Sequence, residues 1–250
     1  MLLRPCGVVL DSACKSLGDE GCKDMAVDLA ATSRDGPLRQ VYLHANGFSC
    51  LGAEYLAAAA LLSAGSHGGL QRIIRLCLHE NRIGDRGASA LFEAMRRGAL
   101  QDLARLDLSC NLVGDGGAEA LGRLLESTAL PALEEISLAS NLIGDIGCEA
   151  LVLACDAAAD SWPLLEQLNL RANRIRPYEV AATIAATPHG MRLLASSLRE
   201  QRDPDGDSDA PPAMCEEKAG AWLDAVLHSL QPLVERREAE VEALREAEEV

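Results

Sequence analysis

An asparagine returns at intervals of 30 to 35 residues through most of the chain, and this regularity limits the possible folds more than any other sequence feature. Apolar residues stand eight, five and three residues before each copy. The five copies are Asn46, Asn81, Asn111, Asn141 and Asn173. The last two apolar positions are two residues apart, which is the periodicity of a half-buried strand. Each repeat is therefore predicted to begin with a short strand facing a common core.

A glycine-rich turn follows three of the asparagines and leads into a predicted helix. The turn has the pattern Gly-Asp-x-Gly, beginning at Gly84, Gly114 and Gly144. An Ala-Leu pair follows at helical spacing, and the aspartate is a residue type that caps the start of a helix. Because an asparagine amide both donates and accepts hydrogen bonds, the stacked copies are predicted to form a ladder that satisfies backbone groups.

Two stretches, LARLDLSCNLVGDGGAEAL and LEEISLASNLIGDIGCEAL, resemble leucine-rich repeats of the ribonuclease-inhibitor type. The resemblance extends over roughly residues 1–187. It implies an α/β solenoid shaped as a horseshoe, with parallel strands on the concave face, helices on the convex face and here an α-helical C-terminal extension.

The ends of the repeat pattern divide the chain, since the terminal repeats of a solenoid act as caps. Near the N-terminus, Leu17, Gly18 and Asp19 keep the turn, but the asparagine is missing. We expect an N-terminal capping repeat at 1–37, five repeats at 38–187, a helical cap at 188–202, an acidic linker at 203–213 and C-terminal helices at 214–250. Two interpretations of the last helices stay open: they cover the end of the solenoid, or their thin apolar stripe binds a partner helix.

Composition argues against several classes of function. The formal net charge is −15, so nucleic acid is not an expected partner. The nine cysteines include no Cys-x-x-Cys pair, which argues against a disulfide framework and a structural zinc site. No run of 18 apolar residues occurs, so membrane insertion is not expected. The expected location is cytoplasmic, with organellar import left open.

The side chains between the core-facing leucines are predicted to form an interaction surface. This surface is basic and aromatic in the early repeats and acidic in the later ones, which suits a partner of complementary charge. The simpler alternative is that these charges only solvate an exposed sheet. The predicted partner-binding residues are Arg39, Tyr42, His44, Arg75, His79, Arg105, Asp107, Glu135, Asn169 and Arg171.

The strands also carry residue types found in catalytic and metal sites. His44, His79, Asp107 and Cys110 are expected on neighbouring strands, but no pocket or oriented base accompanies them, so neither catalysis nor a metal site is predicted. The run of alternating aspartates that begins at Asp203 lacks the discriminating glycine and glutamate of a calcium loop. No cofactor and no small-molecule substrate are expected.

The sequence thus favours a non-catalytic scaffold that binds a partner protein through the concave strand face, and in one interpretation through the C-terminal helices or as a subunit of a larger complex. The resemblance also implies an alternative, regulation of a small GTPase. Activators of the Ran GTPase are similar in having such repeats followed by an acidic segment. This chain departs from them in its fewer repeats and its short acidic tail.

Overall fold

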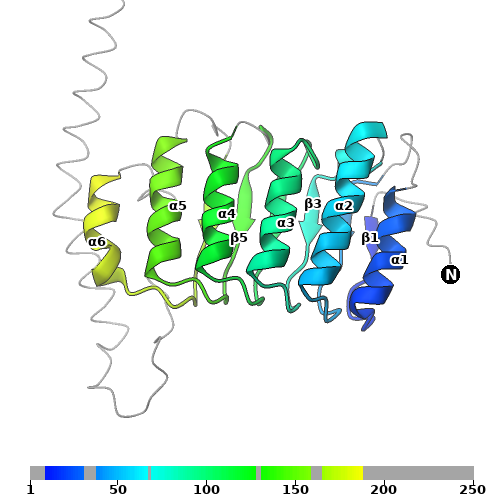
Figure 1. Ribbon diagram of the computed structural model, residues 1–250, viewed down its shortest axis with the longest axis horizontal. Coiled ribbons are helices and arrows are strands. Elements are labelled where there is room, and N and C mark those ends of the chain that lie inside the picture. The colour runs from blue at the N-terminus through cyan, green and yellow to red at the C-terminus, as the bar shows by residue number, and fades with distance from the viewer. Residues whose placement is uncertain (1–8, 31–37, 67–68, 128–130, 159–164, 188–250) are drawn as a thin grey trace, which may run out of the picture.

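The structure is a computed structural model in which strands and helices alternate along the chain (Figure 1). The predicted helical cap at 188–202, acidic linker at 203–213 and C-terminal helices at 214–250 lie outside the described residues. The structure describes residues 9–30, 38–66, 69–127, 131–158 and 165–187.

Six short strands form one parallel sheet and lie side by side in chain order. The strands are β1 (Val9–Asp11), β2 (Gln40–Tyr42), β3 (Arg75–Cys77), β4 (Arg105–Asp107), β5 (Glu135–Ser137) and β6 (Gln167–Asn169). Their register places equivalent repeat positions next to each other, as Leu76 beside Leu106. A helix follows every strand, so the predicted α/β solenoid is confirmed.

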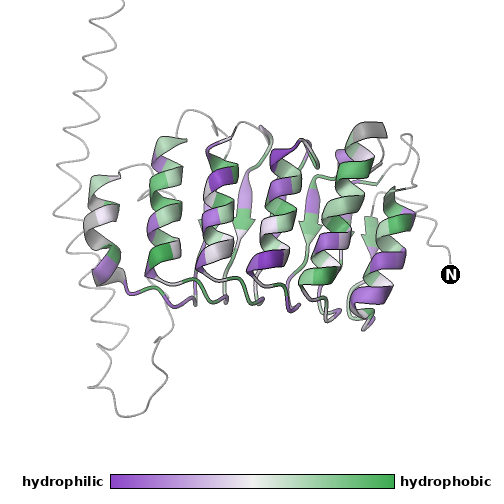
Figure 2. Ribbon diagram, viewed as in Figure 1, coloured by the Kyte–Doolittle hydropathy of each residue, from purple (hydrophilic) through white to green (hydrophobic). Residues whose placement is uncertain are grey.

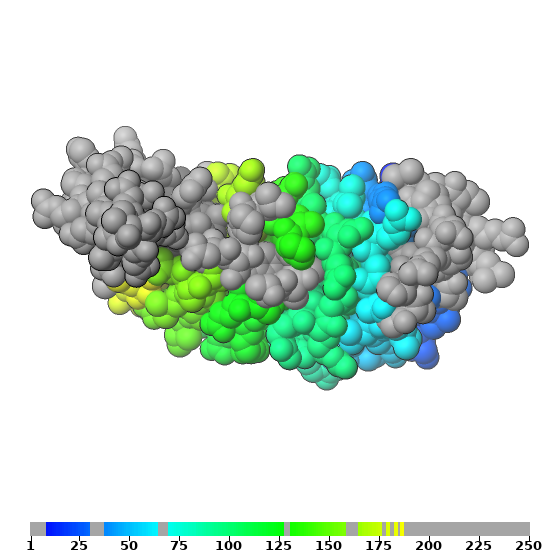
Figure 3. Space-filling model, turned by 90° about the horizontal axis from the view of Figure 1, so that it is seen from above, coloured from blue at the N-terminus to red at the C-terminus, as the bar shows by residue number. Residues whose placement is uncertain are grey.

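The helices stand in a row on one side of the sheet (Figure 1). They are α1 (Gly18–Ala30), α2 (Cys50–Ser66), α3 (Asp85–Arg96), α4 (Asp115–Leu125), α5 (Asp145–Ala157) and α6 (Pro177–Ala186), with a short 3-10 helix, η1, at Gly69–Arg72. Seen from above, the repeats follow one another in a single row (Figure 3). A helix is wider than a strand, so a stack with one of each per repeat is expected to curve with its strands on the inner side.

The hydrophobic core lies between the sheet and the row of helices. The apolar strand positions supply its inner layer, and Leu43, Leu78 and Leu108 are all 0% exposed. Phe48 and Phe92 are also fully buried, although aromatics make up only 3% of the chain. Polar residues interrupt the apolar ones on the outer side of α1, α3 and α4 (Figure 2), so these helices have one face in the core and one in solvent.

Each repeated asparagine joins its own repeat to the one before it. In Asn111, Nδ2 donates to the carbonyl oxygens of Leu78 and Leu108, each at 3.0 Å, and Oδ1 accepts from the Ile83 N–H at 3.0 Å. Equivalent bonds are made by Asn46, Asn81, Asn141 and Asn173. All five side chains are buried, so they satisfy backbone groups that water does not reach.

The aspartate of the Gly-Asp-x-Gly turn does not cap its own helix, and that prediction is wrong. Asp85 is the first residue of α3, and its Oδ1 accepts from the N–H groups of Gly114 (2.6 Å) and Gly117 (3.0 Å) at the start of α4. Asp115 makes the same contacts to the start of α5. The residue preceding each of α3, α4 and α5 is a glycine without a side chain, so the capping side chain comes from the neighbouring repeat.

The first two strand–helix units vary this pattern. In the second unit, β2 with α2, Cys50 stands in place of the aspartate, and its Sγ accepts from the Gly84 N–H at 3.3 Å. In the first repeat the Asp19 carboxylate accepts from the N–H groups of Ser49 (2.8 Å) and Gly52 (3.0 Å) and from the Ser49 hydroxyl (2.6 Å). Burial opposes the ionisation of Asp19, but these hydrogen bonds outweigh it and hold the pKa of its carboxyl below the ordinary value of 3.8.

Candidate functional site

The outward side chains of the strands form one continuous surface, which we call the strand face. Its first row holds Gln40, Arg75, Arg105, Glu135 and Gln167. Its second row holds Tyr42, Cys77, Asp107, Ser137 and Asn169. Its third row, just past the strand ends, holds His44, His79, Ser109, Ala139 and Arg171. Each row repeats one position of the fold, and the residues within a row differ in charge and size.

The charge of the first-row side chains changes from positive to negative along the sheet. Arg75 and Arg105 lie side by side on β3 and β4, and Glu135 follows on β5. The Nε of Arg105 is 3.7 Å from Oε2 of Glu135 and 3.9 Å from Oε2 of Glu134. These side chains are almost half exposed, so the ion pairs contribute little stability and leave both charges open to a partner.

A hollow of about 170 Å³ lies where the first two rows meet. Both positive and negative groups open onto it, together with a thiol and a phenol. Its polar lining consists of Tyr42, Arg75, Cys77, Arg105, Asp107, Glu135 and Ser137. The hollow therefore offers a depression at the centre of the surface that the sequence predicts to bind.

A tight cluster of imidazole and thiol groups lies beside the hollow. The rings of His44 and His79 are stacked, with centroids 4.3 Å apart and an interplanar angle of 11°. The Sγ of Cys77 is 3.0 Å from Nδ1 of His79 and 4.0 Å from Nδ1 of His44. Burial raises the pKa of the Cys77 thiol, and the negative charge of Asp107 adds to this, while a hydrogen bond with the backbone of His79 and the charge of Arg75 act the other way.

Asp107 borders this cluster from the next strand. Its Oδ1 accepts from the Ser109 N–H at 2.9 Å and from the Ser109 hydroxyl at 2.5 Å. Its Oδ2 faces the cluster, 3.5 Å from Nδ1 of His79 and 3.9 Å from Sγ of Cys77. Ser109 thus orients the carboxylate, and one oxygen remains directed at the imidazole and the thiol.

Some of the predicted binding residues are placed elsewhere. Arg39 lies one position before the first row, which Gln40 occupies, and its guanidinium donates to the Arg72 carbonyl oxygen at 2.9 Å. Asn169 and Arg171 lie at the β6 end, where the Asn169 side chain accepts from the Arg171 N–H at 3.1 Å. The residues brought together at the centre are Tyr42, His44, Arg75, His79, Arg105, Asp107 and Glu135.

The thiol of the cluster comes from Cys77, whereas the sequence argument grouped Cys110 with the histidines. Cys110 is exposed and lies directly before Asn111, with a φ of 54°, outside the strand alternation. Cys77 is the last residue of β3, and His79 follows two residues later where the hydrogen bonds between neighbouring strands continue, so both side chains leave the sheet on the same side. The Cys-x-His spacing was the sequence signal for this pair.

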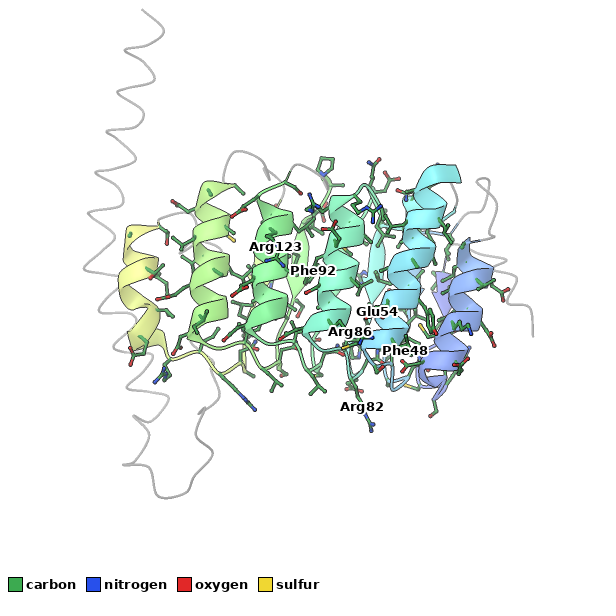
Figure 4. All side chains as sticks on the ribbon, in the orientation of Figure 1. Phe48, Glu54, Arg82, Arg86, Phe92 and Arg123 are labelled. Atoms are coloured by element: carbon green, nitrogen blue, oxygen red, sulfur yellow. The ribbon has the colours of Figure 1, made fainter. Side chains whose placement is uncertain are left out.

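The helix side differs in kind from the strand face. Glu54 of α2 and Arg86 of α3 form an ion pair, in which Arg86 Nη2 donates to Oε2 of Glu54 at 3.1 Å (Figure 4). Two further arginines are exposed away from the strand face: Arg123 on α4, and Arg82 in the turn before α3 (Figure 4). Arg82 and Arg123 provide matched controls for changes on the strand face.

Three segments of the chain match a known repeat profile. The sequence profile described as "Leucine Rich repeat" matches residues 75–92, 99–122 and 130–152. These three segments are leucine-rich repeats. No curated protein matches the sequence. Among solved structures, "Leiomodin-1 Actin-Binding Site 2 (ABS2)" is similar, with 16% identity, a TM-score of 0.35, and coverage of 64% of this chain and 80% of that one.

Within the residues that the structure describes, no helix is both long and apolar enough to cross a membrane.

The predicted resemblance to GTPase activators depends on the acidic segment after residue 202, which lies outside the described residues. It therefore stays a prediction, which a comparison of GTP hydrolysis by a small GTPase with and without this protein would test.

Proposed function

We propose that the protein is a non-catalytic interaction scaffold that binds a partner protein through the centre of its strand face. The observation that carries this proposal is the contrast between constant inward positions and varied outward positions on the same strands. Leu76 and Leu106 pack side by side in the core, while the neighbouring outward pair is Cys77 and Asp107. The fold tolerates such variation because the outward side chains of the strands do not pack in the hydrophobic core.

The partner that suits this surface has two charges in a fixed order. An acidic group would lie over Arg75 and Arg105, and a basic group over Glu134 and Glu135. Complementary charge of this kind favours correct orientation and faster association more than it adds affinity. A protruding side chain of the partner would occupy the hollow between them.

We also propose that the repeats are of the ribonuclease-inhibitor type and that the protein acts in the cytoplasm. The subtype is supported by the repeat length of about 30 residues and by an α-helix after every strand. The location rests on the free cysteines, which suit a reducing compartment.

The experiment compares partner capture by two double variants with the same charge change. Arg75→Glu with Arg105→Glu reverses the strand face, and Arg82→Glu with Arg123→Glu reverses exposed arginines away from it. Each is used as bait in an extract of the native source, and cross-linked partners are quantified by mass spectrometry. The strand-face variant should lose the partners that the wild type and the control variant retain. Equal retention by both variants would rule out the strand face as the binding site.

A further inference from the structure

We propose that His44, Cys77 and His79, together with Asp107, form a zinc-binding site on the strand face. The potential ligand atoms of the two histidines and the cysteine all lie within 4.8 Å of one another. Imidazole nitrogen, thiolate sulfur and carboxylate oxygen are the ligands that zinc takes in proteins. The site lies on the face proposed to bind a partner, but it does not rest on that proposal and is tested on the purified protein alone.

The distances around Cys77 lie close to the edges of a zinc tetrahedron. With Zn–S of about 2.3 Å and Zn–N of about 2.0–2.1 Å, neighbouring ligand atoms lie about 3.3–3.6 Å apart. The Sγ of Cys77 is 3.0 Å, 4.0 Å and 3.9 Å from Nδ1 of His79, Nδ1 of His44 and Oδ2 of Asp107. The Asp107 oxygen is 3.5 Å from Nδ1 of His79. Shifts of about half an ångström would bring the atoms of Cys77, His79 and Asp107 around one ion, and the His44 ring would have to turn toward it.

The ligands stand on the most regular part of the fold. They come from three adjacent strands, whose hydrogen bonds continue past the strand ends: the Leu43 N–H donates to the Cys77 carbonyl oxygen at 2.8 Å, and the Ala45 N–H to that of His79 at 3.1 Å. Strand spacing then places the two imidazoles against each other, as their stacking shows. The strands thus fix the positions of the ligand residues before an ion arrives, which favours binding, while the stacked rings must turn so that both point a nitrogen at it.

Asp107 is already oriented as a ligand. Ser109 donates two hydrogen bonds to Oδ1, and this leaves Oδ2 facing Cys77 and His79. Groups that hold a ligand in place through its other atom are a regular feature of metal sites. The fourth coordination position would thus be filled by the carboxylate from β4.

Charge and proton balance are consistent with a divalent ion. Zinc replaces the thiol proton: the S–H bond of Cys77 breaks, an S–Zn bond forms, and the proton leaves to solvent. Both imidazoles bind in their neutral form. One thiolate and one carboxylate then neutralise the two positive charges of the ion, so no net charge is left in a site whose cysteine is only 6% exposed.

The test is calorimetric titration of the full chain with zinc chloride, after removal of metal with EDTA and under reducing conditions. We expect one ion per chain at this site, and affinity at least about tenfold weaker in Cys77→Ser. Cys110→Ser is the matched control, since it removes an exposed cysteine close in sequence and should leave the affinity unchanged. Asp107→Asn should weaken binding without abolishing it.

Cobalt(II) provides a second readout. A thiolate-to-cobalt charge-transfer band should appear in the wild type and in Cys110→Ser and be absent from Cys77→Ser. If Cys77→Ser does not fold, as judged by circular dichroism, the double variant His44→Gln with His79→Gln replaces it, because both imidazoles are partly exposed. Zinc affinity and a cobalt band that survive loss of Cys77 or of both histidines would overturn the proposal.

Discussion

The inner and outer faces of the six strands differ more than any other two regions of the molecule. On the inner face, five successive repeats bury Val41, Leu76, Leu106, Ile136 and Leu168 at one position. On the outer face, the next position holds Tyr42, Cys77, Asp107, Ser137 and Asn169. A buried position accepts only apolar side chains of similar volume, whereas an outward position is not restricted by packing. The variation therefore marks the surface that is available for binding.

The edge where strands turn into helices belongs with the inner face, although its residues are polar. Asn111 and Asp115 have counterparts in most of the other repeats because backbone groups of neighbouring repeats depend on them. Residues are thus repeated wherever the fold depends on them, at polar positions that bond the backbone as well as at buried apolar positions. If this division is correct, substitutions at the repeated polar positions should lower stability and substitutions on the strand face should not.

The largest effect is expected for Asn111→Ala. It leaves the buried Ile83 N–H without its partner, at about 1–3 kcal/mol. It also removes one of the two bonds that the carbonyl oxygens of Leu78 and Leu108 accept from asparagine side chains, at about 0.5–1.5 kcal/mol each. We expect the free energy of unfolding to fall by about 3 kcal/mol or more in urea denaturation. The control is Ser137→Ala on the outer face, with an expected change within about 0.5 kcal/mol. Equal losses would show that both faces are structural.

A smaller effect is expected for Asp19→Ala, which removes the carboxylate that caps α2 from the first repeat. The loss at pH 7 should be about 1–2 kcal/mol. Because folding lowers the pKa of this carboxyl, its contribution is present above the unfolded pKa of about 4 and disappears as the pH falls through the folded pKa.

The difference between wild type and Asp19→Ala should therefore be full at pH 7 and narrow below pH ~4, in denaturation curves measured across this range. Asp24→Ala, on the exposed side of α1, is the control and should change stability by less than about 0.5 kcal/mol. A difference that stays constant into acid would mean that the Asp19 charge does not contribute.

The smallest effect is a gain of stability in Cys50→Asp. This change restores the residue that the other repeats use, and its carboxylate can accept from the Gly84 N–H, which now bonds to sulfur. We expect the free energy of unfolding to rise by about 0.5–1 kcal/mol, because a charged acceptor at a helix start is stronger than a thiol. Cys110→Asp makes the same change away from a helix start and should not raise the melting temperature.

The spacing of apolar residues was enough to predict the fold class and the inward positions, because burial acts on each residue separately. The target of the aspartate could not be read in the same way. A Gly-Asp pair before a helix suggests a cap for that helix, yet Asp85 reaches Gly114 in the next repeat. The distance between those residues depends on how repeats stack, which local sequence does not contain.

The sequence by itself determined the repeat, its length and which side chains enter the core, since these follow from periodicity and hydrophobicity. The tertiary structure alone decided which outward residues meet. Stacking placed Cys77 beside the histidine pair and Asp107, and Cys110, with a left-handed φ of 54°, lies outside the strand alternation. Residues about 30 positions apart become neighbours only once strand register is set, so the binding surface is a property of the stacked repeats.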